Sequence, residues 1–291
     1  MRFAFIHAEK ACYPITVLCR VMGVSRSGYH AWSRRAPSAR LLEDRRLAYE
    51  VEAVFVRSRC TYRSPRIAEE LRASGRPIGA KRVARIMRSR RIAARPRRRF
   101  KTTTDSRHRQ PIAPNLVERN FEAAAPNRVR VGDVKAVSTD RGCLHLAVLM
   151  DLFSRRIVGF ATSVSNDANL ALSALRNSLA TRVSCPGLVH HTDRGSPYAS
   201  AEYRQLLEQH GAVASMSRPR DCWDNAVAES FFSTLTAELL KGRRFGSPDQ
   251  AAAEIADYIE RFYNLARRHS TIGYVSPIEL ELRHLAAAST A

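Results

Sequence analysis

The hydrophobic pattern of this 291-residue chain is clearest from about residue 126 onward, where it predicts a mixed sheet covered by helices. Segments with the alternating or continuous apolar pattern of strands are separated by stretches with helical periodicity. Their order, βββαβαβα, predicts antiparallel hairpins followed by crossover helices, which is the ribonuclease-H-like α/β arrangement with helices on both faces of five strands. The elements are strands at about 128–138, 143–151 and 156–164, a helix at 167–182, a strand ending at Asp193, a helix at 199–210, a strand at 212–216, a helix containing Glu229 and a helix from Pro248 to about Leu265.

The N-terminal part has short helical patterns broken by glycines and predicts two all-α helix-turn-helix units. In the first unit, Pro14 opens a helix, Gly23 ends it and Ser25 caps the next one. A pattern this short also fits a helical hairpin that packs on another element. The second unit ends in a strongly basic helix after residue 79, which can either contact DNA phosphates or present a solvated face. The cations of this helix that we expect to contact DNA are Lys81, Arg82, Arg85 and Arg88.

The charge of the chain is concentrated at its N-terminal end. The formal net charge is +21, and residues 1–110 hold 28 Lys and Arg against 8 Asp and Glu, whereas the remainder holds 20 against 19. A basic module joined to a nearly neutral one is typical of a polyanion-binding region attached to a separate working domain. We therefore expect a basic helical DNA-binding region at 1–94, a basic linker at 95–125 that lies along DNA through Arg97, Arg98 and Arg99, and a catalytic core at 126–286.

The cysteines and the hydropathy of the chain indicate in which cellular compartment the protein acts. The six cysteines include no C-x-x-C pair, which favours reduced thiols and argues against a zinc site. No segment has the pattern of a membrane span or of a secretory signal. These observations predict an intracellular, cytoplasmic protein with no membrane partner.

Three acids occupy positions that suit a shared site. Asp133 lies in the middle of the first strand, Asp193 ends a buried strand, and Glu229 lies on an apolar helix for which Asp224 is the expected N-cap. Considered singly, each has an ordinary structural interpretation as a strand-edge charge, a turn residue or a helix-surface acid. Two further residues near these acids, Arg218 and Asn225, are candidates for DNA contact. Two histidines before Asp193, His190 and His191, are expected in the core.

The motifs around these acids form an ordered set. They read H-T-D-R-G-S at 191–196, D-N-A-x-x-E-S-F-F at 224–232 and Y-N-x-x-R-R-H-S-T-I-G-Y-x-S-P at 263–277. The set resembles the integrase-like core of insertion-sequence transposases, the DDE recombinases, in particular the product of their second reading frame. The resemblance implies that Asp133, Asp193 and Glu229 are catalytic residues that bind two Mg²⁺ ions, with Mn²⁺ as a substitute.

The same resemblance implies a function and partners. The function is DNA strand cleavage and strand transfer at the ends of the element, with its terminal repeats and target DNA as partners. It also implies a homo-oligomer on DNA, association with the nucleoid, and the first-reading-frame protein as a further partner. Two other interpretations stay open at this point: a catalytically impaired DNA-binding regulator of transposition, and a ribonuclease-H-type nuclease.

The chain departs from the family pattern at two positions. The family usually has Trp three residues before the first acid, where this chain has Arg130. It also tends to place Lys or Arg seven residues after the glutamate, where this chain has Thr236. Helical spacing puts Thr236 on the same face as Glu229, so we expect an exposed position at which a lysine would be accommodated and would strengthen the hold on DNA.

Overall fold

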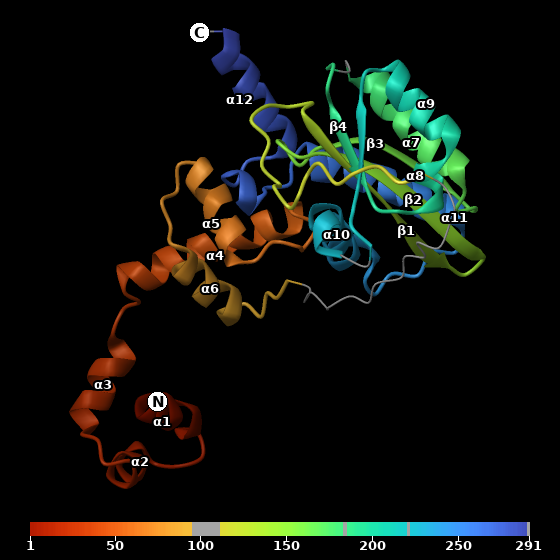
Figure 1. Cartoon of the computed structure of the whole chain (residues 1–291). Helices are drawn as coiled ribbons and strands as arrows, with labels where there is room; N and C mark the ends of the chain where they lie inside the picture. The colour runs from red at the N-terminus through yellow and green to blue at the C-terminus, as the bar shows by residue number, and fades with distance from the viewer. Residues whose placement is uncertain (95–110, 183–184, 220–221, 290–291) are drawn as a thin grey trace.

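The computed structural model describes residues 1–94, 111–182, 185–219 and 222–289, and its C-terminal part contains the mixed five-stranded sheet that the sequence predicts (Figure 1). The strand order is β3-β2-β1-β4-β5, with β1, β4 and β5 parallel and β1, β2 and β3 antiparallel. The strand that carries the first acid is therefore central. The strands are β1 (Val129–Thr139), β2 (Gly142–Asp151), β3 (Ile157–Ser163), β4 (Val189–Thr192) and β5 (Val213–Met216).

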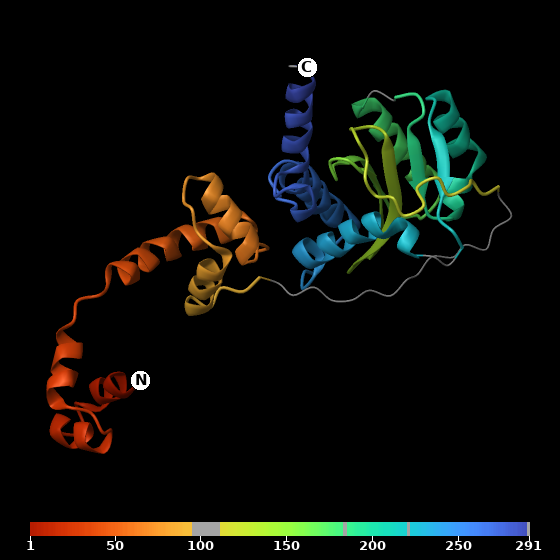
Figure 2. The same ribbon diagram turned by 60° about the vertical axis from the view of Figure 1, so that its left-hand side comes forward.

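Helices cover both faces of the sheet, as Figures 1 and 2 show. Side chains alternate along β2, so Ala147 and Leu149 join the apolar cluster beneath one helical layer while Val148 and Met150 join the cluster beneath the other. The first layer is α7 (Ala168–Thr181), α8 (Ser196–Ala199) and α9 (Ala201–Gln209). The second is α10 (Ala226–Leu235) and α11 (Pro248–Asp257), which continue as the π-helical segments η2 (Thr236–Leu240) and η3 (Tyr258–Asn264).

The first N-terminal unit has a small core of its own. Gly23 takes the left-handed conformation, with φ of +64°, and the hydroxyl of Ser25 accepts a hydrogen bond from the Gly28 amide, which confirms the predicted break and cap. Ile6, from a helix that the sequence pattern did not reveal, is fully buried in this core. The helices are α1 (Arg2–Glu9), α2 (Ile15–Val21) and α3 (Arg26–Arg34).

The second N-terminal unit packs against the sheet domain. Its buried Val51 and Ile67 belong to the same continuous apolar cluster as Phe262 of the C-terminal part. Ion pairs reinforce the contact at its edges, among them Arg268–Glu70 at 2.8 Å. The second unit and the sheet domain therefore share one hydrophobic core. The helices of this unit are α4 (Ala39–Arg57), α5 (Ser64–Ala73) and α6 (Ala80–Ser89).

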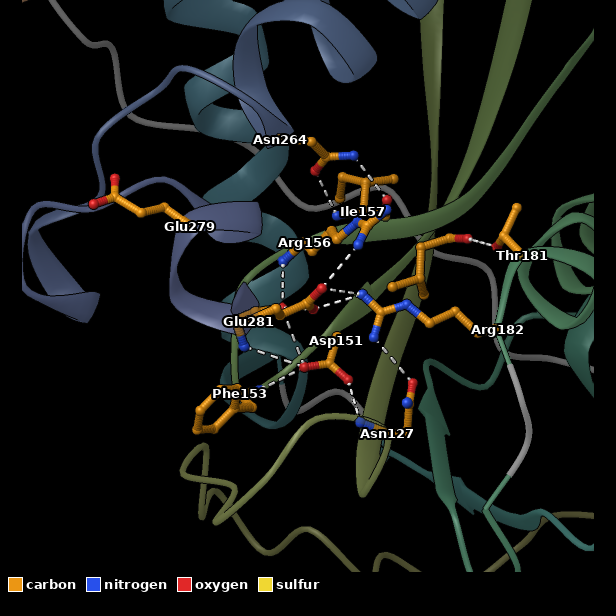
Figure 3. Close-up of polar contacts among 12 residues, drawn as sticks. Asn127, Asp151, Phe153, Arg156, Ile157, Thr181, Arg182, Asn264, Glu279 and Glu281 are labelled. Atoms are coloured by element: carbon orange, nitrogen blue, oxygen red, sulfur yellow. Dashed lines mark hydrogen bonds and ion pairs between the residues drawn. The ribbon is translucent and has the colours of Figure 1, made fainter. Parts of the chain in front are cut away.

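The last helix, α12 (Pro277–Ser289), is held to the sheet by a buried carboxylate. Glu281 pairs with Arg156, beside the start of β3, and with Arg182, at the end of α7 (Figure 3). Two opposite charges around one buried acid compensate its desolvation and hold its pKa below the ordinary value. No helix within the described ranges combines the length and hydropathy needed to cross a membrane.

Candidate active site

The sheet brings Asp133 and Asp193 side by side. The last pair in the parallel β1–β4 ladder is Gly132 with Thr192, so the two aspartates follow it at the same level of adjacent strands. Neighbouring strands are about 4.8 Å apart, and residues at one level of a parallel pair point to the same face. Asp193 is held further by its own turn, because its Oδ1 accepts a hydrogen bond from the Gly195 amide at 2.9 Å.

Glu229 approaches the same place from α10. It lies in the first turn of this helix, which packs on the β1 face that carries Val131 and Asp133. The helix is apolar on its inner side, as predicted, because Phe231 and Leu235 are buried beneath it, while Glu229 stays exposed. The structure therefore brings the three predicted acids close enough for the charges of Asp193 and Glu229 to act on Asp133, near the point where β4 ends beside the middle of β1.

The electrostatics of the acids show that they interact. The pKa of Asp133 is raised from 3.8 to about 8, mainly by burial and in addition by the nearby charges of Asp193 and Glu229. Desolvation also raises the pKa of Glu229. A cluster of carboxylates without a compensating cation favours protonation of one member, and here that member is Asp133.

Two buried polar atoms beside the acids suit a hydrated cation. The hydroxyl of Tyr198 has no hydrogen-bond partner. Burial raises its pKa, and the charges of Asp133 and Asp193 contribute in the same direction, so the hydroxyl remains a donor. The Oδ1 atom of Asn225 is likewise buried without a partner. Mg²⁺ prefers oxygen ligands and keeps several waters, which would satisfy such groups. Within the described part of the chain, no group of three or more His, Cys, Asp or Glu side chains is arranged so that it could hold a metal ion without further ligands or movement.

The prediction that Asp224 is the N-cap of the Glu229 helix is wrong. Asn225 occupies the cap position, and Asp224 lies in the preceding 3₁₀ turn, η1 (Cys222–Asn225), with its side chain fully buried. The carboxylate accepts hydrogen bonds from Arg218 at 2.7 and 2.9 Å and from Arg119 at 3.2 Å, and the Arg218 contacts hold its pKa well below the ordinary value. Arg218, a candidate for DNA contact, is thus paired inside the protein while half of its side chain remains exposed.

At neither of the two positions that depart from the family pattern, Thr236 and Arg130, does the structure place a cation beside the acids. The chain winds as a π-helix from Thr236, and the Thr236 hydroxyl is buried without a partner, so the expected exposed position is wrong. Arg130 is fully buried, donates to Ser178 and Asn127, and lies on the face of β1 opposite Asp133. Lys135 is the cation of this strand that interacts with Asp133. Burial lowers the pKa of Lys135, and the charge of Asp133 offsets part of this decrease.

The basic helix α6 has the predicted inner face. Its Val83, Ile86 and Met87 are buried. Two of the four predicted DNA-contacting cations are paired within the protein, because Arg82 bonds Glu43 and Asp44 while Arg85 bonds Asp44. Lys81 and Arg88 are exposed. The candidates Arg97, Arg98 and Arg99 lie outside the described residues.

The histidines before Asp193 belong to the core, as expected. His190 bonds the Tyr203 hydroxyl at 2.7 Å, and burial lowers its pKa to about 3. His191 contacts the Ser215 hydroxyl at 2.8 Å and the backbone oxygen of Asp224 at 3.1 Å. Sequence patterns did not single out Tyr198, whose buried hydroxyl lies near the two aspartates only in the folded chain.

Sequence-family matches identify this part of the chain as an integrase core domain. Residues 123–222 and 210–277 each match a sequence family described as an integrase core domain, and residues 42–100 match one described as an HTH-like domain. The core also resembles the HTLV-2 integrase catalytic core domain, solved in complex with magnesium, at 17% identity and a TM-score of 0.42 over 55% of this chain and 99% of that one.

Full-length relatives specify the family. The transposase InsF of insertion sequence IS3A from Escherichia coli K12 is 38% identical over 98% of this chain and 100% of the relative. A 31 kDa protein of insertion element IS600 from Shigella sonnei is 42% identical over 89% of this chain and 96% of the relative. The chain therefore belongs to the IS3 family of insertion-sequence transposases, which makes it a DNA-binding enzyme with an integrase core.

Proposed function

We propose that this transposase cleaves and joins DNA strands at the ends of its element with Asp133, Asp193 and Glu229 as the catalytic, metal-binding acids. The observation that carries the proposal is the position of Asp133 and Asp193 directly after the last pair of the β1–β4 ladder, Gly132 with Thr192. The charges of Asp193 and Glu229 are also close enough to contribute to the raised pKa of Asp133. Clustered carboxylates of this kind are stable in their charged forms only when a cation compensates them.

The acids suit two Mg²⁺ ions, for which Mn²⁺ is a substitute. Such ions lower the pKa of an attacking hydroxyl and stabilise the leaving oxygen of a phosphodiester. The chain supplies the setting: Asp193 is fixed by the Gly195 amide, and Asn225 holds the helix of Glu229 against β1 through the Gly132 carbonyl. Tyr198 offers a buried hydroxyl donor next to the two aspartates.

We propose that residues other than the three catalytic acids supply most of the binding to DNA. The proposed division is a helical DNA-binding region at 1–94, a linker at 95–125 that carries Arg97, Arg98 and Arg99, and the core at 126–286. On α6, Lys81 and Arg88 are the stronger candidates for phosphate contact, since Arg82 and Arg85 already pair with acids of α4. Near the acids, Asn225 and the exposed half of Arg218 remain candidates.

The proposal extends to the assembly in which the enzyme works. Transposition joins two element ends to a target, so we propose a homo-oligomer on DNA that acts at the nucleoid, with the first-reading-frame protein as a further partner. Family membership favours this function over the regulator and the ribonuclease-H-type nuclease, because the whole chain, including its basic helical part, matches transposases.

The direct test is strand cleavage of DNA that carries candidate terminal repeats. Cleavage should require Mg²⁺ or Mn²⁺, stop on chelation, and be followed by joining of the released 3′ end to target DNA. Equal cleavage in the presence of a chelator would overturn the metal-binding role of the acids.

A further inference from the structure

A positively charged cavity lies beside α10. It has a volume of about 500 Å³ and is bounded by the start of α5, by α10 and η2, by Arg155 between β2 and β3, and by residues 267–274 around η4 (Ser270–Ile272). The surrounding elements can be followed in Figure 1. The cavity therefore lies where the second helical unit meets the catalytic core.

Arginines dominate its lining. Arg63, Arg66, Arg155 and Arg267 face the cavity, and Glu238 is the single acidic residue among those that line it. This carboxylate is shared, because Arg267 lies 2.8 Å from it and Arg66 lies 3.6 Å from it. Four guanidinium groups around one carboxylate leave an excess of positive charge in a partly enclosed space, which favours an anionic ligand.

Arg155 is the least satisfied of these groups. One of its terminal nitrogens donates to the Phe121 carbonyl at 3.0 Å, while Nη1 is buried without a hydrogen-bond partner. Burial lowers its pKa, which indicates that the charged guanidinium is held in a desolvated position. An anion in the cavity would supply the missing acceptor and compensate the charge.

The cavity lies along the face of α10 next to the face that carries Glu229. Ser230, which lines the cavity, directly follows Glu229 in the chain. One residue turns a helix by about 100°, so the two side chains leave α10 on neighbouring faces. Hydroxyl groups of Ser230 and Thr271 and apolar side chains such as Val227 complete the lining. Guanidinium and hydroxyl donors next to an apolar wall suit a phosphate attached to a sugar and a base.

We propose that this cavity binds a backbone phosphate and its nucleotide from a single DNA strand that passes α10 on its way to the acids. The inference rests on the proposed function and adds to it a holding site for the strand. A volume of about 500 Å³ is that of a small-molecule site, so the cavity admits a nucleotide and excludes a duplex.

The test measures binding of a fluorescein-labelled single-stranded oligonucleotide to the full chain in the presence of a chelator. An oligonucleotide of about 12 nucleotides lies within the usual site size of single-strand binders. Arg63→Gln is the main variant because Arg63 is exposed and can be replaced with little effect on folding. Arg155→Gln is the second variant, and Arg176→Gln is the matched control, since Arg176 is exposed on α7 and pairs with Glu202.

Loss of one phosphate contact should weaken affinity by about fivefold, the effect of removing a partly exposed charge pair. It should also reduce the slope of log affinity against log salt by about 0.7. Arg176→Gln should match wild type. Affinities and slopes for Arg63→Gln and Arg155→Gln that equal those of the control would overturn the proposal.

A photo-cross-linking arm separates this site from the basic N-terminal helices. A 4-thiothymidine oligonucleotide should cross-link to the peptide that contains Thr271 and Tyr274, and excess inorganic phosphate or a mononucleotide should compete only weakly. Cross-links confined to residues 1–94, or equal competition by free phosphate, would contradict a strand-holding site. Asp133→Asn should keep the cross-link while losing cleavage, so failure of the cavity proposal is distinguishable from failure of the catalytic one.

Discussion

Asn225 donates a hydrogen bond from Nδ2 to the backbone oxygen of Gly132 at 3.2 Å, and this bond ties the helix of Glu229 to the strand of Asp133. Since Asn225 precedes the helix and Gly132 precedes the aspartate, the distance between the two acids depends on this contact. The side chain is only 4% exposed, so no water is positioned to replace it easily.

Asn225→Ala should therefore slow strand transfer by more than its loss of stability explains. The lost bond and the unpaired carbonyl should lower the free energy of unfolding by about 1–3 kcal/mol. Asn264→Ala is the matched control, because Asn264 is similarly buried and bonds the backbone of Ile157 away from the acids. Thermal unfolding and transfer rates of the two variants decide the matter: equal residual activity at equal stability would show that Asn225 has no positioning role.

The raised pKa of Asp133 predicts a pH dependence in metal-free protein. Its carboxyl titrates near 3.8 when unfolded and at about 8 when folded, so folding favours the protonated form. This contribution to stability is fully present below about pH 4 and is lost as the pH rises toward 8. Asp133→Asn should therefore become more stable than wild type by up to a few kcal/mol as the pH approaches 8.

Mg²⁺ provides the complementary measurement for Asp133. A cation that binds the folded protein should raise the melting temperature of wild type at pH 8 and have little effect on Asp133→Asn. Parallel stability profiles of the two proteins from pH 4 to 8 in chelator would contradict the assigned electrostatics.

The two kinds of cation on α6 should behave differently when neutralised. Lys81→Gln should weaken DNA binding uniformly across sequences and reduce the salt slope by about 0.9. Arg82→Gln should mainly lower stability, because Arg82 bonds both Glu43 and Asp44. Fluorescence anisotropy between 50 and 200 mM salt tests this, and for the whole chain we expect a fall in affinity of roughly 10³ to 10⁵ if about 6 to 10 phosphates are contacted. Equal salt slopes for the two variants would argue against the assignment.

We expect Lys135 to supply the DNA-holding positive charge that the family tends to place at the position of Thr236. Its Nζ lies 5.9 Å from the centre of the Phe232 ring on α10, and it interacts with the charge of Asp133. Lys135→Gln should lower strand transfer, most clearly at high salt, whereas Lys135→Arg should retain most of it because the charge is kept. Transfer by Lys135→Gln at wild-type rates across DNA concentrations would remove Lys135 from the site.

Local patterns predicted the fold, whereas the three acids were singled out by their order and by the family resemblance of the motifs around them. Strand alternation and glycine breaks are short-range signals, and they predicted the sheet and the strand that ends at Asp193. Asp224 was misassigned because its partners Asn115 and Arg119 are more than a hundred residues earlier in the chain. The Thr236 hydroxyl is buried at the start of a π-helical segment, and the sequence gives no periodic signal for this change of winding.

The packing of the second helical unit on the core also lay beyond sequence analysis. It depends on apolar side chains such as Val51 and Phe262, which are individually ordinary core residues. The arginine-lined cavity arises from this packing, so its lining was not visible in any single motif.

The most direct test of the account is strand cleavage and transfer by Asp133→Asn, Asp193→Asn and Glu229→Gln with terminal-repeat DNA and Mg²⁺. Each variant should lose activity while DNA binding stays nearly unchanged and the fold is retained. Each change removes a carboxylate from the proposed metal-binding acids while keeping the size of the side chain. Near-wild-type activity in any folded variant would remove that residue from the catalytic site and contradict the central claim.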